Sequence, residues 1–114
     1  MLPKKNRLRK KKDFEKVFKN GKGFKEDFLI LKIKKNKIKE LRFGFIVSQK
    51  VSKKAVVRNK VKRRLREAIK EIAKNISKKA DIVLIALPGL ETKDFQTIKK
   101  TIEKLFKRAE ILNF

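Results

Sequence analysis

The feature that most constrains the fold is a basic run, residues 48–67, which also carries an apolar stripe that continues to Ile72. Nine Lys or Arg lie between Lys50 and Arg66, and no acid precedes Glu67. Apolar residues in its second half recur at intervals of three, four and one, which places them on one side of a helix: Val61, Leu65, Ala68, Ile69 and Ile72. The pattern predicts a helix, ending near Asn75, that packs on a core and presents a cationic arc to solvent.

The cationic arc suits a polyanionic partner. Each guanidinium offers paired donors to a phosphate, and each released counterion adds favourable entropy. A solvated helix face is the plainer alternative, but such faces normally mix acids with bases, whereas here i,i+4 neighbours such as Lys62 and Arg66 repel each other. Asn59, an amide among these cations, is either a helix cap or a ligand for a base edge, a sugar hydroxyl or a hydrated metal.

The composition supports a nucleic-acid partner and excludes several other classes. The 114 residues suit one domain, and the formal net charge of +24 points to nucleic acid or an anionic membrane. No apolar run approaches the roughly 20 residues of a membrane-spanning helix. We therefore expect a cytoplasmic protein with no membrane partner and no small-molecule substrate. The chain has no Cys and no His, which excludes thiol nucleophiles, zinc sites and the usual general base.

The N-terminal part of the chain predicts an arm followed by a short helix. Residues 1–12 are basic and have little to bury, so we expect a flexible arm ahead of a single domain at 13–114. Asp13 is expected to cap a helix that ends at Asn20, with Gly21 in a left-handed conformation.

Three strands and a final helix are predicted beyond this point. The strands are residues 27–35, 40–48 and 80–87, the last in the centre of the sheet because it is apolar throughout. An amphipathic helix is predicted from Asp94 onward. The first two strands are expected to pair as an antiparallel hairpin.

Alternation along these two strands divides their side chains into two sets. One set is Phe28, Ile30, Phe43, Phe45 and Val47, and the other is Leu29, Leu31, Arg42, Gly44 and Ile46. Both sets are partly apolar. Either helices cover one face and leave a partly apolar cleft on the other, or both faces are buried.

Two motifs in the chain resemble the protein component of bacterial ribonuclease P. One is Ala55 followed by Arg58-Asn59-Lys60-Val61-Lys62-Arg63-Arg64-Leu65-Arg66-Glu67, and the other is Asp13-Phe14, Val17-Phe18 and Gly21. The order of elements agrees over nearly all of the chain. The resemblance implies an α/β (α+β) two-layer sandwich in the order helix, strand, strand, strand, helix, strand, helix, with a fourth strand near Phe24 and a left-handed crossover.

Members of this family are non-catalytic protein subunits of an endoribonuclease that removes the 5′ leader of precursor tRNA. The resemblance implies two partners, the catalytic ribonuclease P RNA and precursor tRNA, and cleavage by the RNA with bound Mg²⁺. The residues implied to contact the catalytic RNA are Arg58, Asn59, Lys60, Lys62, Arg63 and Arg66. Those implied to line a cleft for the leader are Phe14, Phe18, Leu29, Leu31, Ile46, Asn59 and Arg63. No catalytic residue or metal ligand is implied in the protein.

Three positions depart from the family pattern. Leu31 stands where many members carry an aromatic residue, Ser52-Lys53 replaces a common Gly-Asn, and Leu87 replaces an Arg that often follows the last strand. These departures bear on affinity for the leader more than on binding to the catalytic RNA. From the residues alone, core packing is the plainer explanation of Phe14 and Phe18.

Three other functions share the basic composition. A ribosomal or general RNA-packing protein would not depend on Asn59 or on a leader cleft. A protein-only nuclease would need a cluster of carboxylates, whereas the twelve Asp and Glu are scattered along the chain. A DNA-binding helix would fit a major groove, but no second helix closely precedes it, as a helix-turn-helix requires.

Overall fold

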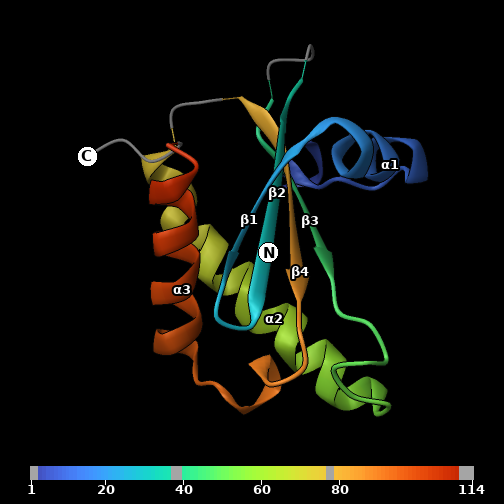
Figure 1. Ribbon diagram of the computed structural model, residues 1–114, viewed down its shortest axis with the longest axis vertical. Coiled ribbons are helices and arrows are strands. Elements are labelled where there is room, and N and C mark those ends of the chain that lie inside the picture. The colour runs from blue at the N-terminus through green and yellow to red at the C-terminus, as the bar shows by residue number, and fades with distance from the viewer. Residues whose placement is uncertain (1–2, 37–39, 77–78, 111–114) are drawn as a thin grey trace.

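The computed structural model describes residues 3–36, 40–76 and 79–110, and it has the predicted order of elements (Figure 1). The helices and strands are α1 (Lys11–Asn20), β1 (Lys22–Glu26), β2 (Leu29–Lys35), β3 (Arg42–Ile46), α2 (Ala55–Ile72), β4 (Ala80–Ala86) and α3 (Phe95–Arg108). Short 3-10 turns occupy Lys4–Asn6, Ala73–Asn75 and Leu90–Thr92. The α+β class and the short strand at Phe24 are confirmed.

The four strands form one mixed sheet in the order β1-β2-β4-β3. β4 is central, as predicted, and nearly all of its side chains are buried. The predicted hairpin between residues 27–35 and 40–48 is wrong, because β2 pairs antiparallel with β1 and β4 lies between β2 and β3. Alternation identifies a strand but does not choose its neighbour, and the most apolar strand takes the centre. β3 and β4 are parallel neighbours joined by the α2 crossover.

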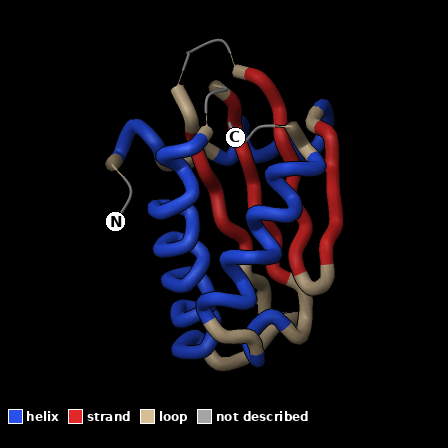
Figure 2. The backbone as a smooth tube through the Cα atoms, turned by 90° about the vertical axis from the view of Figure 1, so that its left-hand side faces the viewer, coloured by secondary structure: helices blue, strands red, loops and turns tan. Residues whose placement is uncertain are grey.

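The two faces of the sheet are covered differently. α2 and α3 lie side by side over one face (Figure 2) and enclose the larger core with side chains such as Leu29, Leu31, Phe43 and Leu84. α1 lies on the opposite face from α3 (Figure 1), over a smaller cluster of apolar residues that includes Val83. Leu29 and Leu31 of β2 therefore share a face with Phe43 and Phe45 of β3, whereas the predicted sets placed these two pairs on opposite faces.

The ends of α1 differ from the prediction. The helix begins at Lys11, and Asp13 lies inside its first turn and pairs with Arg42 instead of capping the helix. Gly21 is extended, with φ −83° and ψ 162°, so a left-handed conformation is not its role. A Cβ at Gly21 would collide with the carbonyl oxygen of Val17 and lie 2.8 Å from that of Ile33. Glycine is required here because the end of the helix passes close to β2.

The N-terminal segment packs along the outer edge of β3, in contrast to the flexible arm that the composition predicts. The amide of Leu8 donates to the carbonyl oxygen of Phe43 at 2.7 Å, and Asn6 Nδ2 donates to the carbonyl oxygen of Leu41 at 2.7 Å. The Leu8 side chain is buried in the cluster beneath α1. One apolar residue within a run of cations thus anchors the segment.

Candidate RNA interface

The helix α2 buries the side that its periodicity predicts. All five residues of the apolar stripe are buried, namely Val61, Leu65, Ala68, Ile69 and Ile72. Asn59, Lys60, Arg63, Arg66 and Lys70 are exposed. The amphipathic pattern therefore fixes which cations reach solvent.

Charged residues on the two sides of α2 make different contacts. Towards α3, Glu71 accepts a salt bridge from Lys99 at 2.8 Å, and this hydrogen bond raises the pKa of Lys99. Towards β3, Arg66 Cζ lies 6.0 Å from the centroid of the Phe45 ring, within the range of a cation–π contact. The acid Glu71 is thus engaged by the neighbouring helix, while Arg63 points to solvent from the middle of the exposed side.

Two arginines of α2 donate hydrogen bonds to backbone carbonyl oxygens. Arg58 Nη1 donates to the carbonyl oxygens of Ser52 and Lys53 at 3.0 and 2.9 Å, which braces the loop ahead of the helix. Arg64 Nη1 donates to the carbonyl oxygen of Lys93 at 2.9 Å. These contacts give both side chains a structural role.

Asn59 is not a helix cap. α2 begins four residues earlier, at Ala55, with Lys54 as its N-cap, and Asn59 is exposed within the helix. The capping role is therefore wrong for Asn59, and its role as a ligand for RNA stays a prediction.

The face that carries α1 has a partly open apolar strip. Ile30, Ile85 and Ile46 are register partners on β2, β4 and β3, and all three are half-buried. Phe14 and Phe18 of α1 have ring centroids 6.5 Å apart, and Phe18 is 38% exposed. Aromatic rings beside an apolar floor and surface cations are suited to single-stranded nucleic acid, because stacking tolerates any base.

The packing of the Phe14 ring depends on a glycine of β3. A Cβ on Gly44 would lie 2.5 Å from two ring carbons of Phe14. The ring therefore rests directly against the strand, a contact that no sequence pattern signals.

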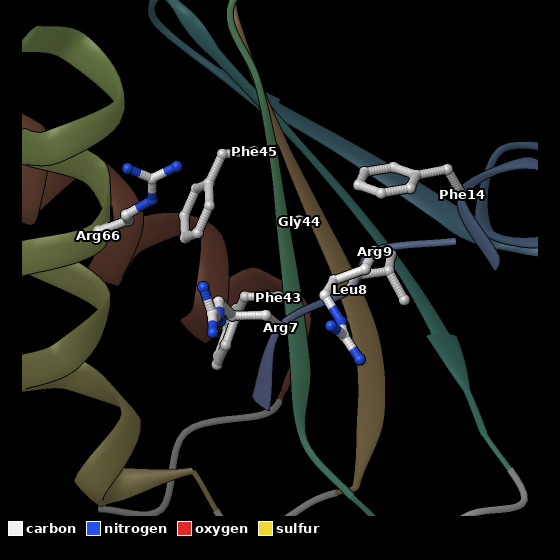
Figure 3. A pocket seen from close by; sticks show the side chains of 8 residues that line it. All are labelled: Arg7, Leu8, Arg9, Phe14, Phe43, Gly44, Phe45 and Arg66. Carbon is white, nitrogen blue, oxygen red and sulfur yellow. The ribbon is translucent and has the colours of Figure 1, made fainter. Parts of the chain in front are cut away.

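A hollow of about 310 Å³ at the outer edge of β3 connects the α1 and α2 surfaces (Figure 3). It is lined by Arg7, Leu8, Arg9, Phe14, Phe43, Gly44, Phe45 and Arg66. Two of these residues, Phe14 and Arg66, are predicted site residues. Arg7 and Phe45 were missed because neither lies in a motif.

Within the described ranges 3–36, 40–76 and 79–110, no three His, Cys, Asp or Glu side chains are grouped so that they could hold a metal ion. None of the described helices has the length and hydropathy needed to cross a membrane.

Comparison with known proteins assigns the chain to a family. The sequence profile described as Ribonuclease P matches residues 2–110. The chain belongs to the ribonuclease P protein family. It is 38% identical over 111 residues to the ribonuclease P protein component of Clostridium botulinum (strain 657 / Type Ba4), covering 96% of this chain and 99% of that protein. It is 42% identical over 105 residues to the component from Clostridioides difficile (strain 630), covering 91% of both.

The fold agrees with that of solved ribonuclease P proteins. The structure of the Staphylococcus aureus RNase P protein superposes with a TM-score of 0.86 at 30% identity, covering 95% of this chain and 98% of that one. Proteins of this family are the protein component of a ribonucleoprotein endoribonuclease that acts in tRNA 5′ processing. An RNA is therefore a partner of this ribonuclease P protein.

Two of the predicted leader-cleft residues of the ribonuclease P protein are wrong. Leu29 and Leu31 are fully buried and belong to the core beneath α2 and α3, on the opposite face from Phe14. A shift of one residue along a strand moves a side chain to the other face, so Ile30 takes the place expected of its neighbours.

The other predicted site residues stay predictions. Ile46 lies on the α1 face, in the apolar strip. Asn59 and Arg63 lie on α2, which packs against the opposite face. The structure brings Arg66, not these two residues, to the hollow that Phe14 also lines.

Proposed function

We propose that this ribonuclease P protein binds the ribonuclease P RNA through the exposed side of α2 and the 5′ leader of precursor tRNA across the α1 face of the sheet. The observation that carries the proposal is the separation of two surfaces on one small sheet. The α2 surface holds Asn59, Lys60, Arg63 and Arg66, and the α1 surface holds Phe14, Phe18 and Ile46. Cations suit phosphates of a folded RNA, and rings suit an unpaired strand.

In this proposal the protein positions RNA and the RNA cleaves. Mg²⁺ would be held mainly by the RNA subunit. The carboxylates of Asp13 and Asp81 are both engaged by Arg42, and that of Glu71 is engaged by Lys99. Cations beside the RNA lower the repulsion between its phosphates, which favours productive substrate binding at low Mg²⁺. Bacterial precursor tRNA is processed in the cytoplasm, so the proposal places the protein there.

The deciding experiment is cleavage of precursor tRNA at low Mg²⁺. Three reactions are compared: a bacterial ribonuclease P RNA with the protein, the RNA alone, and the protein alone. Cleavage that requires both components supports the subunit function. Cleavage by the protein alone would make the chain a nuclease, and RNA binding without any stimulation of cleavage would make it a general RNA-packing protein.

A further inference from the structure

The hollow at the outer edge of β3 is cationic and partly aromatic. Its lining includes the side chains of Arg7, Arg9 and Arg66 and no acid (Figure 3). Guanidinium groups around one hollow repel each other, so an anion bound among them would stabilise the arrangement.

Strand alternation turns Arg7 towards α2. Arg7 forms a parallel bridge with Phe43, and the next residue, Leu8, is buried on the α1 side. Neighbouring side chains of an extended segment point to opposite sides. Figure 3 accordingly shows Arg7, Phe45 and Arg66 on the same side of β3.

Hydrogen bonds within the protein do not satisfy the Arg7 guanidinium. Its Nε is buried and has no hydrogen-bond partner among the residues that the structure describes. Leaving a buried charged donor unpaired is costly, so an anion bound in the hollow beside this guanidinium would offset part of that cost. The Phe45 ring is half-buried, with Arg66 Cζ 6.0 Å from its centroid. One guanidinium group thus lies over a partly accessible ring, in a hollow that a second guanidinium group also lines.

We propose that Arg7, Phe45 and Arg66 form a binding site for one nucleotide of the RNA subunit. The two guanidinium groups hold the phosphate, because their planar donors match its oxygens. The ring of Phe45 contacts the sugar or base, which an inorganic anion could not use. The site rests on the proposed function, and it extends the RNA interface from α2 to the N-terminal segment.

The test is the affinity of the full chain for a bacterial ribonuclease P RNA transcript over a series of salt concentrations. Arg7→Ala and Arg66→Ala are each expected to weaken binding about tenfold and to reduce the salt slope by about one. Because both side chains hold the same phosphate, the double variant should weaken binding by less than the product of the two single effects. Lys104→Ala, which removes an exposed cation of α3, is the control and should change affinity little.

A second pair of variants tests the ring. Phe45→Leu keeps an apolar side chain but removes the ring, and it should weaken binding, whereas Phe45→Tyr should bind like the wild type. Melting temperatures are measured alongside, and affinities are compared where every variant is folded.

The outcomes separate this site from the proposed function. Failure of the wild-type chain to bind the transcript would overturn the proposed function. Wild-type binding with Arg7→Ala no weaker than Lys104→Ala, or with Arg7 and Arg66 effects that multiply fully, would overturn the nucleotide site alone.

Discussion

Arg42 on β3 and Asp81 on β4 are register partners of two parallel strands, and their side chains meet through two hydrogen bonds. Nε lies 2.8 Å from Oδ1 and Nη2 lies 2.7 Å from Oδ2. The third nitrogen of the guanidinium, Nη1, lies 3.2 Å from Oδ2 of Asp13 in the first turn of α1. A single side chain therefore ties the helix that carries Phe14 and Phe18 to the centre of the sheet.

Replacing Arg42 with Met is expected to destabilise the protein by about 3 kcal/mol, since removal of one partner leaves a buried charge uncompensated. Asp81 is only 6% exposed. Denaturant unfolding measures the change. Asp13→Asn, which keeps the Arg42–Asp81 pair, is the control and should cost clearly less. Equal losses in the two variants would mean that the link to α1, not the pair across the strands, supplies the stability.

The stability that Arg42 supplies should not depend on pH near neutrality. The hydrogen bond from Arg42 to Asp81 is the main cause that raises the pKa of the guanidinium above its ordinary value. A cation with a raised pKa in the folded state contributes stability that is fully present below its unfolded pKa and is lost only as the pH rises through the folded value. The difference between wild type and Arg42→Met should therefore stay constant from about pH 6 to 9. A difference that shrinks in this range would contradict the assignment.

Features that depend on neighbouring residues were predictable from the sequence, and features that depend on distant pairing were not. The spacing of apolar residues predicts the buried side of α2, and the apolar run of β4 predicts its central place, because each pattern lies within one contiguous segment. The burial of Leu31 instead of exposure on the α1 face follows from the phase of β2 relative to β4, which lies far along the chain. Resemblance to a family indicates the strand but not its register.

The hollow at β3 escaped prediction for a similar reason. Charge dominates residues 1–12, and composition treats them as a solvated arm. Burial of Leu8 against Val17 and Val83 outweighs that tendency and carries Arg7 to the edge of β3. A single apolar side chain among cations gives no periodic signal, so only the folded structure brings Arg7 to Arg66.

Replacing Gly44 with Ala should disturb the leader surface. The new Cβ would lie 2.5 Å from the Phe14 ring, so the ring must move. We expect a loss of stability of about 1–3 kcal/mol from overpacking and a lower affinity for precursor tRNA relative to mature tRNA. Gly23→Ala is the matched control, because its Cβ would meet only the end of the flexible Lys32 side chain, no closer than 3.4 Å. Similar effects at both glycines would show that Phe14 does not depend on this contact.

Replacing Phe18 with Ala should separate leader recognition from RNA-subunit binding. The ring is 38% exposed, so its loss should cost little stability. If it stacks on the leader, the preference for precursor over mature tRNA should fall by about tenfold, while affinity for the RNA subunit stays unchanged. Equal loss of both affinities would mean that α1 does not form a distinct leader surface.

Leu31→Ala should act through stability alone. The side chain is fully buried, and truncation of a buried Leu costs about 2–5 kcal/mol. Ile30→Ala, one position earlier, is half-buried on the α1 face and should cost less stability while lowering the preference for precursor tRNA. Unfolding curves and the ratio of the two tRNA affinities measure these effects. If folded Leu31→Ala had a lower preference for precursor over mature tRNA and Ile30→Ala had an unchanged one, Leu31 would line the leader cleft after all.

Arg63 and Arg64 are adjacent on α2 and should respond differently to replacement by Ala. Arg63 is exposed, so Arg63→Ala should weaken binding to the RNA subunit and reduce its salt slope by about one, with an unchanged melting temperature. Arg64 Nη1 donates to the carbonyl oxygen of Lys93, so Arg64→Ala should lower the melting temperature because that carbonyl loses its partner. Both variants remove one charge from the same helix, so an effect of net charge alone would alter their salt slopes equally. Equal slopes in Arg63→Ala and the wild type would remove Arg63 from the RNA interface.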